Sequence, residues 1–89
     1  MTTTIKLQNN TAEPCKLIID EQFLFENIVY GNIAHTGTSY KVFLTEDTIY
    51  RQWPIVYGTV PAIEEDPPQD RTWLITLNDQ RDITQGWEE

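Results

Sequence analysis

The chain has few basic residues. Lysine and arginine together number 6, against 14 aspartates and glutamates, which gives a net charge of −8 at neutral pH. A chain this acidic repels phosphate backbones and anionic lipid surfaces. We therefore expect no direct binding to nucleic acid and none to a membrane. The same charge either attracts a basic protein or simply keeps the protein in solution.

Cysteine and long apolar runs are also scarce. Cys15 is the single cysteine, so the chain forms no internal disulfide and lacks the cysteine-rich spacings of structural zinc sites. Its apolar runs are far shorter than the roughly 18 residues that span a bilayer, and it does not open on a secretion signal. These absences predict a cytoplasmic location, in the host-cell cytoplasm if the protein is viral.

Helical periodicity is missing as well. No extended segment places apolar side chains at the i, i+3, i+4 and i+7 positions of an amphipathic helix. Instead, apolar and polar residues alternate with a period of two in short segments between turn-forming residues, which is typical of β-strands. With 89 residues, 39% of them hydrophobic, we expect a single β domain that spans residues 1–89.

The alternation predicts six or seven short strands. Residues 39–44 show it most cleanly. Residues 3–8 and 15–20 are expected to pair as an antiparallel hairpin, because turn-forming residues separate them. The other expected strands lie at residues 23–30, 48–53, 55–60 and 71–77, followed by a short last strand or a frayed tail after residue 80.

Local features refine this pattern. Glu26 and Asn27 interrupt their segment and predict a bulge or a bend. Glycine and threonine in residues 31–38 predict a loop that carries His35. Pro54 and Pro61 flank residues 55–60, which therefore form an edge strand, because proline donates no hydrogen bond to a sheet.

Together the strands predict an all-β fold. The expected form is a small antiparallel β-sandwich, with a small β-barrel as the alternative. Trp53 and Trp73 occupy strand positions that suit a core. Trp87 lies near the end of the sequence, so it either packs back onto a sheet or anchors a partner.

Catalytic residues are hard to find. A thiol nucleophile would need Cys15 activated by His35, the only histidine. Cys15 takes an inward position in its strand and His35 lies in the expected loop, so we interpret both as structural. The glycines are scattered singly, which excludes a phosphate-binding loop. We expect no enzyme activity and no cofactor.

Acidic residues concentrate in the C-terminal third. Residues 64–89 contain eight acids and two arginines, a net charge of −6 out of −8. They form an acidic loop at residues 64–70 and an acidic tail at residues 84–89. The loop carboxylates lack the spacing of a calcium-binding loop, and prolines interrupt them, so we expect a solvated loop and no metal.

This charge pattern predicts a non-enzymatic protein-binding module. It would act as an acidic inhibitor or a nucleic-acid mimic, such as a phage-borne inhibitor, that engages a basic protein or protein complex. The expected contact residues are Glu64, Glu65, Asp66, Asp70, Tyr57, Trp87, Glu88 and Glu89.

Two alternatives remain open at this stage. The first is a structural, self-assembling β module, for example a homodimer through an edge strand. The second is a small-molecule-binding domain with a pocket between its sheets. Its polar contacts would come from Tyr30, Tyr40, Tyr50 or His35.

Overall fold

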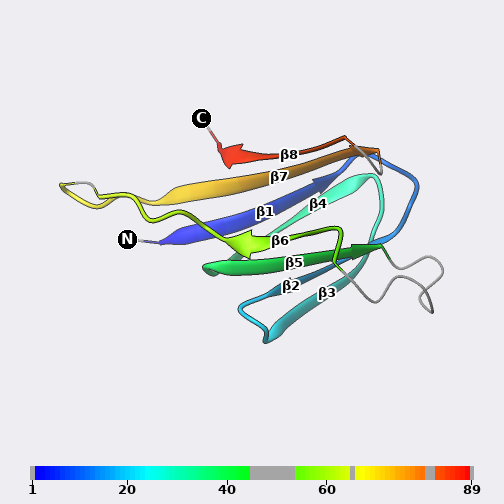
Figure 1. Ribbon diagram of the computed structural model, residues 1–89, viewed down its shortest axis with the longest axis horizontal. Coiled ribbons are helices and arrows are strands. Elements are labelled where there is room, and N and C mark those ends of the chain that lie inside the picture. Colours follow the sequence, from blue (N-terminus) through cyan, green and yellow to red (C-terminus); the bar gives the residue numbers. More distant parts are fainter. Residues whose placement is uncertain (1, 45–53, 65, 80–81, 89) are drawn as a thin grey trace.

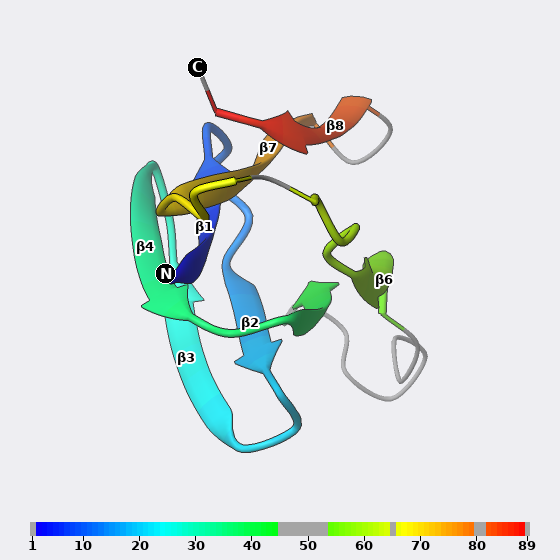
Figure 2. The same ribbon diagram turned by 90° about the vertical axis from the view of Figure 1, so that its left-hand side faces the viewer.

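A computed structural model describes residues 2–44, 54–64, 66–79 and 82–88. Two four-stranded sheets pack face to face, as a small sandwich (Figures 1 and 2). The strands are β1 (Thr3–Asn9), β2 (Cys15–Ile19), β3 (Phe23–Ile28), β4 (Gly31–Thr36), β5 (Ser39–Leu44), β6 (Val56–Thr59), β7 (Arg71–Asp79) and β8 (Asp82–Trp87). The predicted all-β sandwich is confirmed, with eight strands in place of six or seven.

The sheets have the strand orders β4-β1-β7-β8 and β3-β2-β5-β6. The predicted hairpin of β1 and β2 is therefore wrong, since these strands lie in different sheets. The residues between them cross from one sheet to the other, which lets the apolar side chains of both strands face each other across the core. One pairing is also not antiparallel, because β1 runs parallel to β7, with Thr3 opposite Arg71.

The loop expected at residues 31–38 is largely the edge strand β4, which pairs with β1 along its whole length. Its threonine and asparagine residues point outward, so the sequence shows little apolar alternation there. His35 is thus a strand residue, with its ring 4.3 Å from that of Phe23 and 5.5 Å from that of Phe25, centroid to centroid.

Several local predictions are confirmed. β5 has the predicted bounds, and β6 is an edge strand between Pro54 and Pro61. Glu26 and Asn27 form a bulge, since Leu17 pairs with Phe25 and Cys15 with Ile28, which leaves one extra residue on β3. The last strand exists as β8. The strand expected at residues 48–53, with Trp53, and the residue Tyr50 lie outside the described residues.

The core consists of alternate side chains from both sheets, packed between them. Cys15 is fully buried there, as predicted. Trp73 and Trp87 are partly buried and pack against the core. Its most buried large side chains are Ile5, Leu7, Leu17, Ile19, Val42, Leu44, Ile75 and Leu77.

Asn9 is the one fully buried amide or charged side chain among the described residues. Its Nδ2 donates to the carbonyl oxygens of Glu13 at 2.8 Å and Ile28 at 2.7 Å. Its Oδ1 accepts from the amide of Thr11 at 3.0 Å and from the Thr11 hydroxyl at 2.7 Å. Asn9 therefore ties β1, the crossing segment and the end of β3 together.

The sandwich has two unlike sides, visible in Figure 2. On the β3/β4 side, two residues join the strands, and His35 packs on the rings of Phe23 and Phe25. On the β6/β8 side, the two edge strands belong to different sheets and do not pair. Tyr40 bridges this side, because its hydroxyl donates to Gln85 of β8 and accepts from Trp73 Nε1 at 3.3 Å.

Candidate interaction site

The acidic loop and the acidic tail meet at one end of the molecule. The segment between β6 and β7 projects past the strands at the end where β1 begins and β8 ends (Figure 1). The backbone amide of Thr2 donates to Asp70 Oδ1 at 2.8 Å, and the amide of Glu88 donates to the carbonyl oxygen of Thr72 at 2.8 Å. The antiparallel pairing of β7 with β8, in which Trp73 lies opposite Trp87, therefore brings Asp70 and Glu88 to the same end.

A groove of about 340 Å³ opens between this segment and β8. Apolar side chains form much of it, and one of them, Ile63, is 39% exposed. The residues that line the groove are Thr3, Thr38, Thr59, Val60, Pro61, Ala62, Ile63, Gln69, Arg71 and Trp87.

Trp87 connects the groove to the core. Its ring meets that of Trp73 edge to face, with centroids 5.1 Å apart and an interplanar angle of 85°. This confirms the first of the two predictions for Trp87, which packs back onto the sheet. Trp87 also lines the groove, so the same side chain is fixed by the core and available from outside.

The segments that line the groove carry exposed carboxylates. Glu64, Asp66 and Asp70 are exposed, and Glu88 is exposed as well. Glu88 forms an ion pair with Lys6, with Oε2 and Nζ 3.3 Å apart. Glu65 and Glu89 lie outside the described residues.

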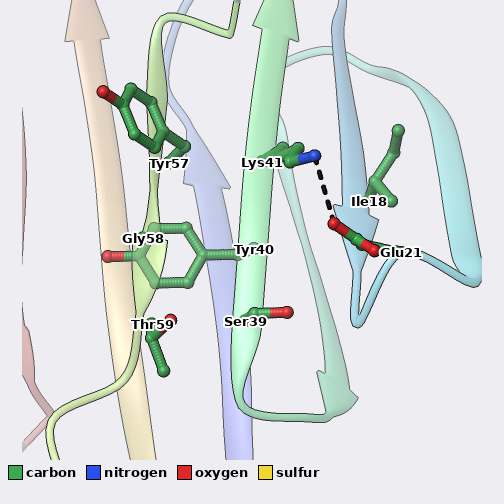
Figure 3. A pocket seen from close by; sticks show the side chains of 8 residues that line it. All are labelled: Ile18, Glu21, Ser39, Tyr40, Lys41, Tyr57, Gly58 and Thr59. Atoms are coloured by element: carbon green, nitrogen blue, oxygen red, sulfur yellow. Dashed lines mark hydrogen bonds and ion pairs between the residues drawn. The ribbon is translucent and has the colours of Figure 1, made fainter.

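Tyr57 lies apart from this group. It is 72% exposed on the outer face of β6 and lines a separate cleft of about 210 Å³ with Lys41 and Glu21 (Figure 3). Lys41 Nζ and Glu21 Oε1 form an ion pair at 3.4 Å. Thr59 is common to the cleft and the groove, but the side chains of Tyr57 and Trp87 belong to different sheets. The structure therefore does not bring Tyr57 together with the other predicted contact residues.

The prediction from sequence missed the apolar part of the groove. Val60, Pro61 and Ile63 were read only as the end of an edge strand and the start of a loop. It also missed an outward row on the second sheet, in which Leu24 pairs with Ile18 across β3 and β2. The signal for that row was present in the alternation, since Ile18 lies opposite the inward positions of its strand.

The catalytic candidates do not meet. Burial, and to a smaller extent the charge of Glu13, raises the pKa of the Cys15 thiol to about 11. Such a thiol stays protonated at neutral pH and is a poor nucleophile. Cys15 contacts Asn9, whereas His35 contacts two phenylalanine rings and the Thr36 carbonyl oxygen, so no hydrogen bond joins Cys15 to His35.

The contacts expected for a small-molecule pocket are also dispersed. Tyr40 is buried and its hydroxyl is held by Gln85 and Trp73. Tyr30 is exposed at the connection between β3 and β4. Across the described ranges, no three histidine, cysteine, aspartate or glutamate side chains gather closely enough to hold a metal ion.

In the part of the chain that the structure describes, no helix is long and apolar enough to cross a membrane. No protein-family model, curated protein or solved structure matches the chain. Any function assigned to this small β-sandwich therefore rests on its own residues.

Proposed function

We propose that the protein is a non-enzymatic recognition module that binds a basic protein at the acidic groove. The acidic groove is the Trp87-lined groove described above together with the exposed carboxylates of the segments that line it, Glu64, Asp66, Asp70 and Glu88. One observation carries the proposal: an exposed apolar groove with a fixed aromatic side chain is lined by segments that also carry exposed carboxylates. Protein interfaces commonly combine such an apolar centre with a polar rim.

The charge balance at the groove supports a basic partner. Four carboxylates stand against two cations, because Arg71 lines the groove and Lys6 pairs with Glu88. The sequence adds two further acids, Glu65 and Glu89, to the same segments. An incoming lysine or arginine can pack its aliphatic stem on Trp87 and direct its charged head at the rim.

The size of the groove suits one such anchor. A volume of about 340 Å³ holds one or two side chains of a partner, so most of the partner would lie outside it. Affinity would then depend on this anchor and on long-range attraction, which raises association rates and weakens with salt. The cytoplasmic location expected from the single cysteine is part of the proposal.

The test uses charge reversal with a matched control. Glu64→Lys with Asp66→Lys reverses two of the four loop carboxylates, and Glu21→Lys with Glu26→Lys makes the same change in net charge away from the groove. We expect the wild type and the control to retain basic proteins from a cell lysate at low salt and to release them at moderate salt. The loop variant should retain far less of the same proteins.

Retention by the loop variant equal to that of the wild type would contradict the proposal. A second variant, Ile63→Ser, removes apolar surface from the groove at constant charge and lies outside the strands. It should weaken retention at every salt concentration, because the apolar contact is not screened by ions.

A self-assembling module is the second candidate, and the outward row of the second sheet favours it. Leu24 is 53% exposed, and the row continues in register through Ile18 and Lys41 to Tyr57. Exposed apolar rows of this kind are common at contacts between proteins. Sedimentation of the pure protein tests the idea, since a monomer at high concentration contradicts it.

A further inference from the structure

Four strands lie at sheet edges, and they differ in how open they are. β3 is bulged at Glu26 and Asn27, and β6 has four residues between two prolines; bulges, short strands and prolines protect an edge from further pairing. β4 carries no acidic residue. β8 has six residues, pairs with β7 in regular register from Ile83 to Trp87, and is flanked by acids.

The backbone of β8 offers hydrogen-bonding groups on its outer edge. The amide of Glu88 donates to the carbonyl oxygen of Thr72, which fixes the alternation of the β7–β8 ladder. Residues of an antiparallel strand point their backbone groups to alternate sides. The N–H and C=O groups of Ile83, Gln85 and Trp87 therefore point away from β7, and no described residue bonds to them.

The inward side chains of these residues hold that edge in place. Gln85 accepts from the Tyr40 hydroxyl, Trp87 packs on Trp73, and Ile83 packs against the core. An edge fixed in this way is already in the conformation that a further strand requires, so little ordering is lost on binding.

The charges at the ends of β8 indicate whether this edge pairs with a second copy of the protein or with a different chain. Antiparallel self-pairing that joins the outward groups of Ile83, Gln85 and Trp87 centres on Gln85. That register puts Asp82 directly opposite the second copy's Glu88, and like charges directly opposite each other destabilise a sheet. A segment with cations at both ends and uncharged residues between them fits the same edge with attraction at both ends.

We propose that the β8 edge accepts an extended segment of the basic partner as an added antiparallel strand, with cationic residues opposite Asp82 and Glu88. This rests on the proposed function and extends it, because Trp87 belongs to both the β8 edge and the acidic groove. Strand addition supplies affinity through backbone hydrogen bonds, and the flanking acids select the sequence. The partner segment runs along β8 and ends at the groove.

The experiment uses a synthetic heptapeptide with lysine at each end and alternating threonine and valine between. In the proposed register its threonines bond to β8 and its valines point their backbone groups outward. One version of the peptide is N-methylated at two of its threonines, and a matched version is N-methylated at its two valines. We expect the threonine-methylated copy to bind about tenfold more weakly than the valine-methylated copy, since two backbone bonds are blocked.

Amide hydrogen exchange on the protein gives an independent measure. The peptide should slow exchange at Ile83, Gln85 and Trp87 and leave Thr84 and Gly86 unchanged, because those two already bond to β7. Asp82→Lys should weaken binding several-fold at low salt, whereas Glu26→Lys, the matched charge reversal on β3, should not. Asp82 lies at the far end of β8 from the groove, so its effect reports on the edge alone.

The strand-addition proposal is overturned if the heptapeptide does not bind at low salt, or if the threonine-methylated copy binds as well as the valine-methylated one. It is also overturned if the protein alone forms dimers that protect the same three amides, which would make a second copy the occupant. If binding is insensitive to methylation but is lost with Glu64→Lys and Asp66→Lys, strand addition fails and the proposed function stands. If methylation weakens binding but the two charge reversals do not, the groove is not the binding site and the proposal for the β8 edge stands.

Discussion

The two long sides of the sandwich are closed in different ways. The β3/β4 side is joined by a two-residue connection, by the tilted ring contacts of His35 with Phe23 and Phe25, and by the Asn9 bond that reaches the end of β3. The β6/β8 side has no strand pairing and is bridged through the single hydroxyl of Tyr40. The first side is built for stability, and the second keeps backbone groups and an aromatic ring accessible.

The contrast also appears in the glycines. Gly37 lies in the turn after β4, where an added Cβ would overlap Ile19 Cγ2. Gly86 lies on β8, where an added Cβ would meet no atom within 4 Å. The turn at Gly37 therefore leaves no space for a side chain, whereas the outer surface of β8 at Gly86 has space for one.

Asn9→Ala should have the largest effect on the closed side. It removes the Asn9 donor from the carbonyl oxygens of Glu13 and Ile28 and the Asn9 acceptor from the amide of Thr11, in bonds that are buried or partly buried. We expect the free energy of unfolding to fall by about 2–4 kcal/mol, because several buried polar groups lose their hydrogen bonds. Chemical denaturation measures this. Asn32→Ala, on the exposed face of β4, is the control and should change little.

The effects of Gly37→Ala and Gly86→Ala on the free energy of unfolding compare the packing of the two sides directly. Ile19 is fully buried and branched at Cβ, so it cannot move aside freely for a new methyl group at residue 37. Gly37→Ala should lower the free energy of unfolding by about 1–3 kcal/mol. Gly86→Ala should be neutral or slightly stabilising, because alanine restricts the unfolded chain. Equal midpoints of thermal unfolding for the two variants would show that the sides are equally packed.

Asp20→Ala should have the smallest effect and a characteristic pH dependence. The amides of Thr38 and Ser39 both donate to Asp20 Oδ1 at 2.9 Å, and these bonds lower the pKa of the Asp20 carboxyl group. The stabilisation is therefore fully present above the ordinary aspartate pKa and is lost as the pH falls through the lowered one.

At neutral pH we expect Asp20→Ala to cost about 1–2 kcal/mol, since charge-assisted hydrogen bonds are lost. Chemical denaturation of both proteins at pH values from 7 downward measures the direction of this pH dependence. The difference between wild type and variant should shrink below about pH 4. A difference that stays constant to the lowest pH would mean that the carboxylate charge is not involved. Glu26→Ala is the control and should stay within about 0.5 kcal/mol of the wild type.

Strands with one buried face could be predicted from the sequence, whereas β4, in which no residue is fully buried, was predicted as a loop. β5 alternates buried and half-buried residues along its whole length, so its bounds were predicted correctly. β4 alternates only half-buried and exposed residues, and its glycine, asparagine and threonine are residue types typical of a loop. The bulge at Glu26 and Asn27 was predictable because two polar residues in a row break the period of two.

The sequence pattern could not predict which distant strands pair with each other. Turn-forming residues after β1 signal a change of direction, but they do not say whether the chain stays in its sheet. Asp70 and Glu88 lie at the same end because β7 and β8 pair antiparallel. The parallel register of β1 and β7 adds Thr3, a residue far away in the chain, to the groove at that end. The acidic segments were thus predicted, whereas the groove between them and the separation of Tyr57 needed the structure.

The parallel pair of β1 and β7 has a consequence for the synthesis of the protein. β1 is synthesised before β7, yet Thr3 finds its place beside Arg71 only after the 67 residues between them have been made. Until then β1 has β4 on one side and an open edge on the other. Pairing of such distant segments slows folding and leaves strand edges exposed on the nascent chain. β1, which precedes the other described strands in the sequence, is therefore among the last of them to be fully paired.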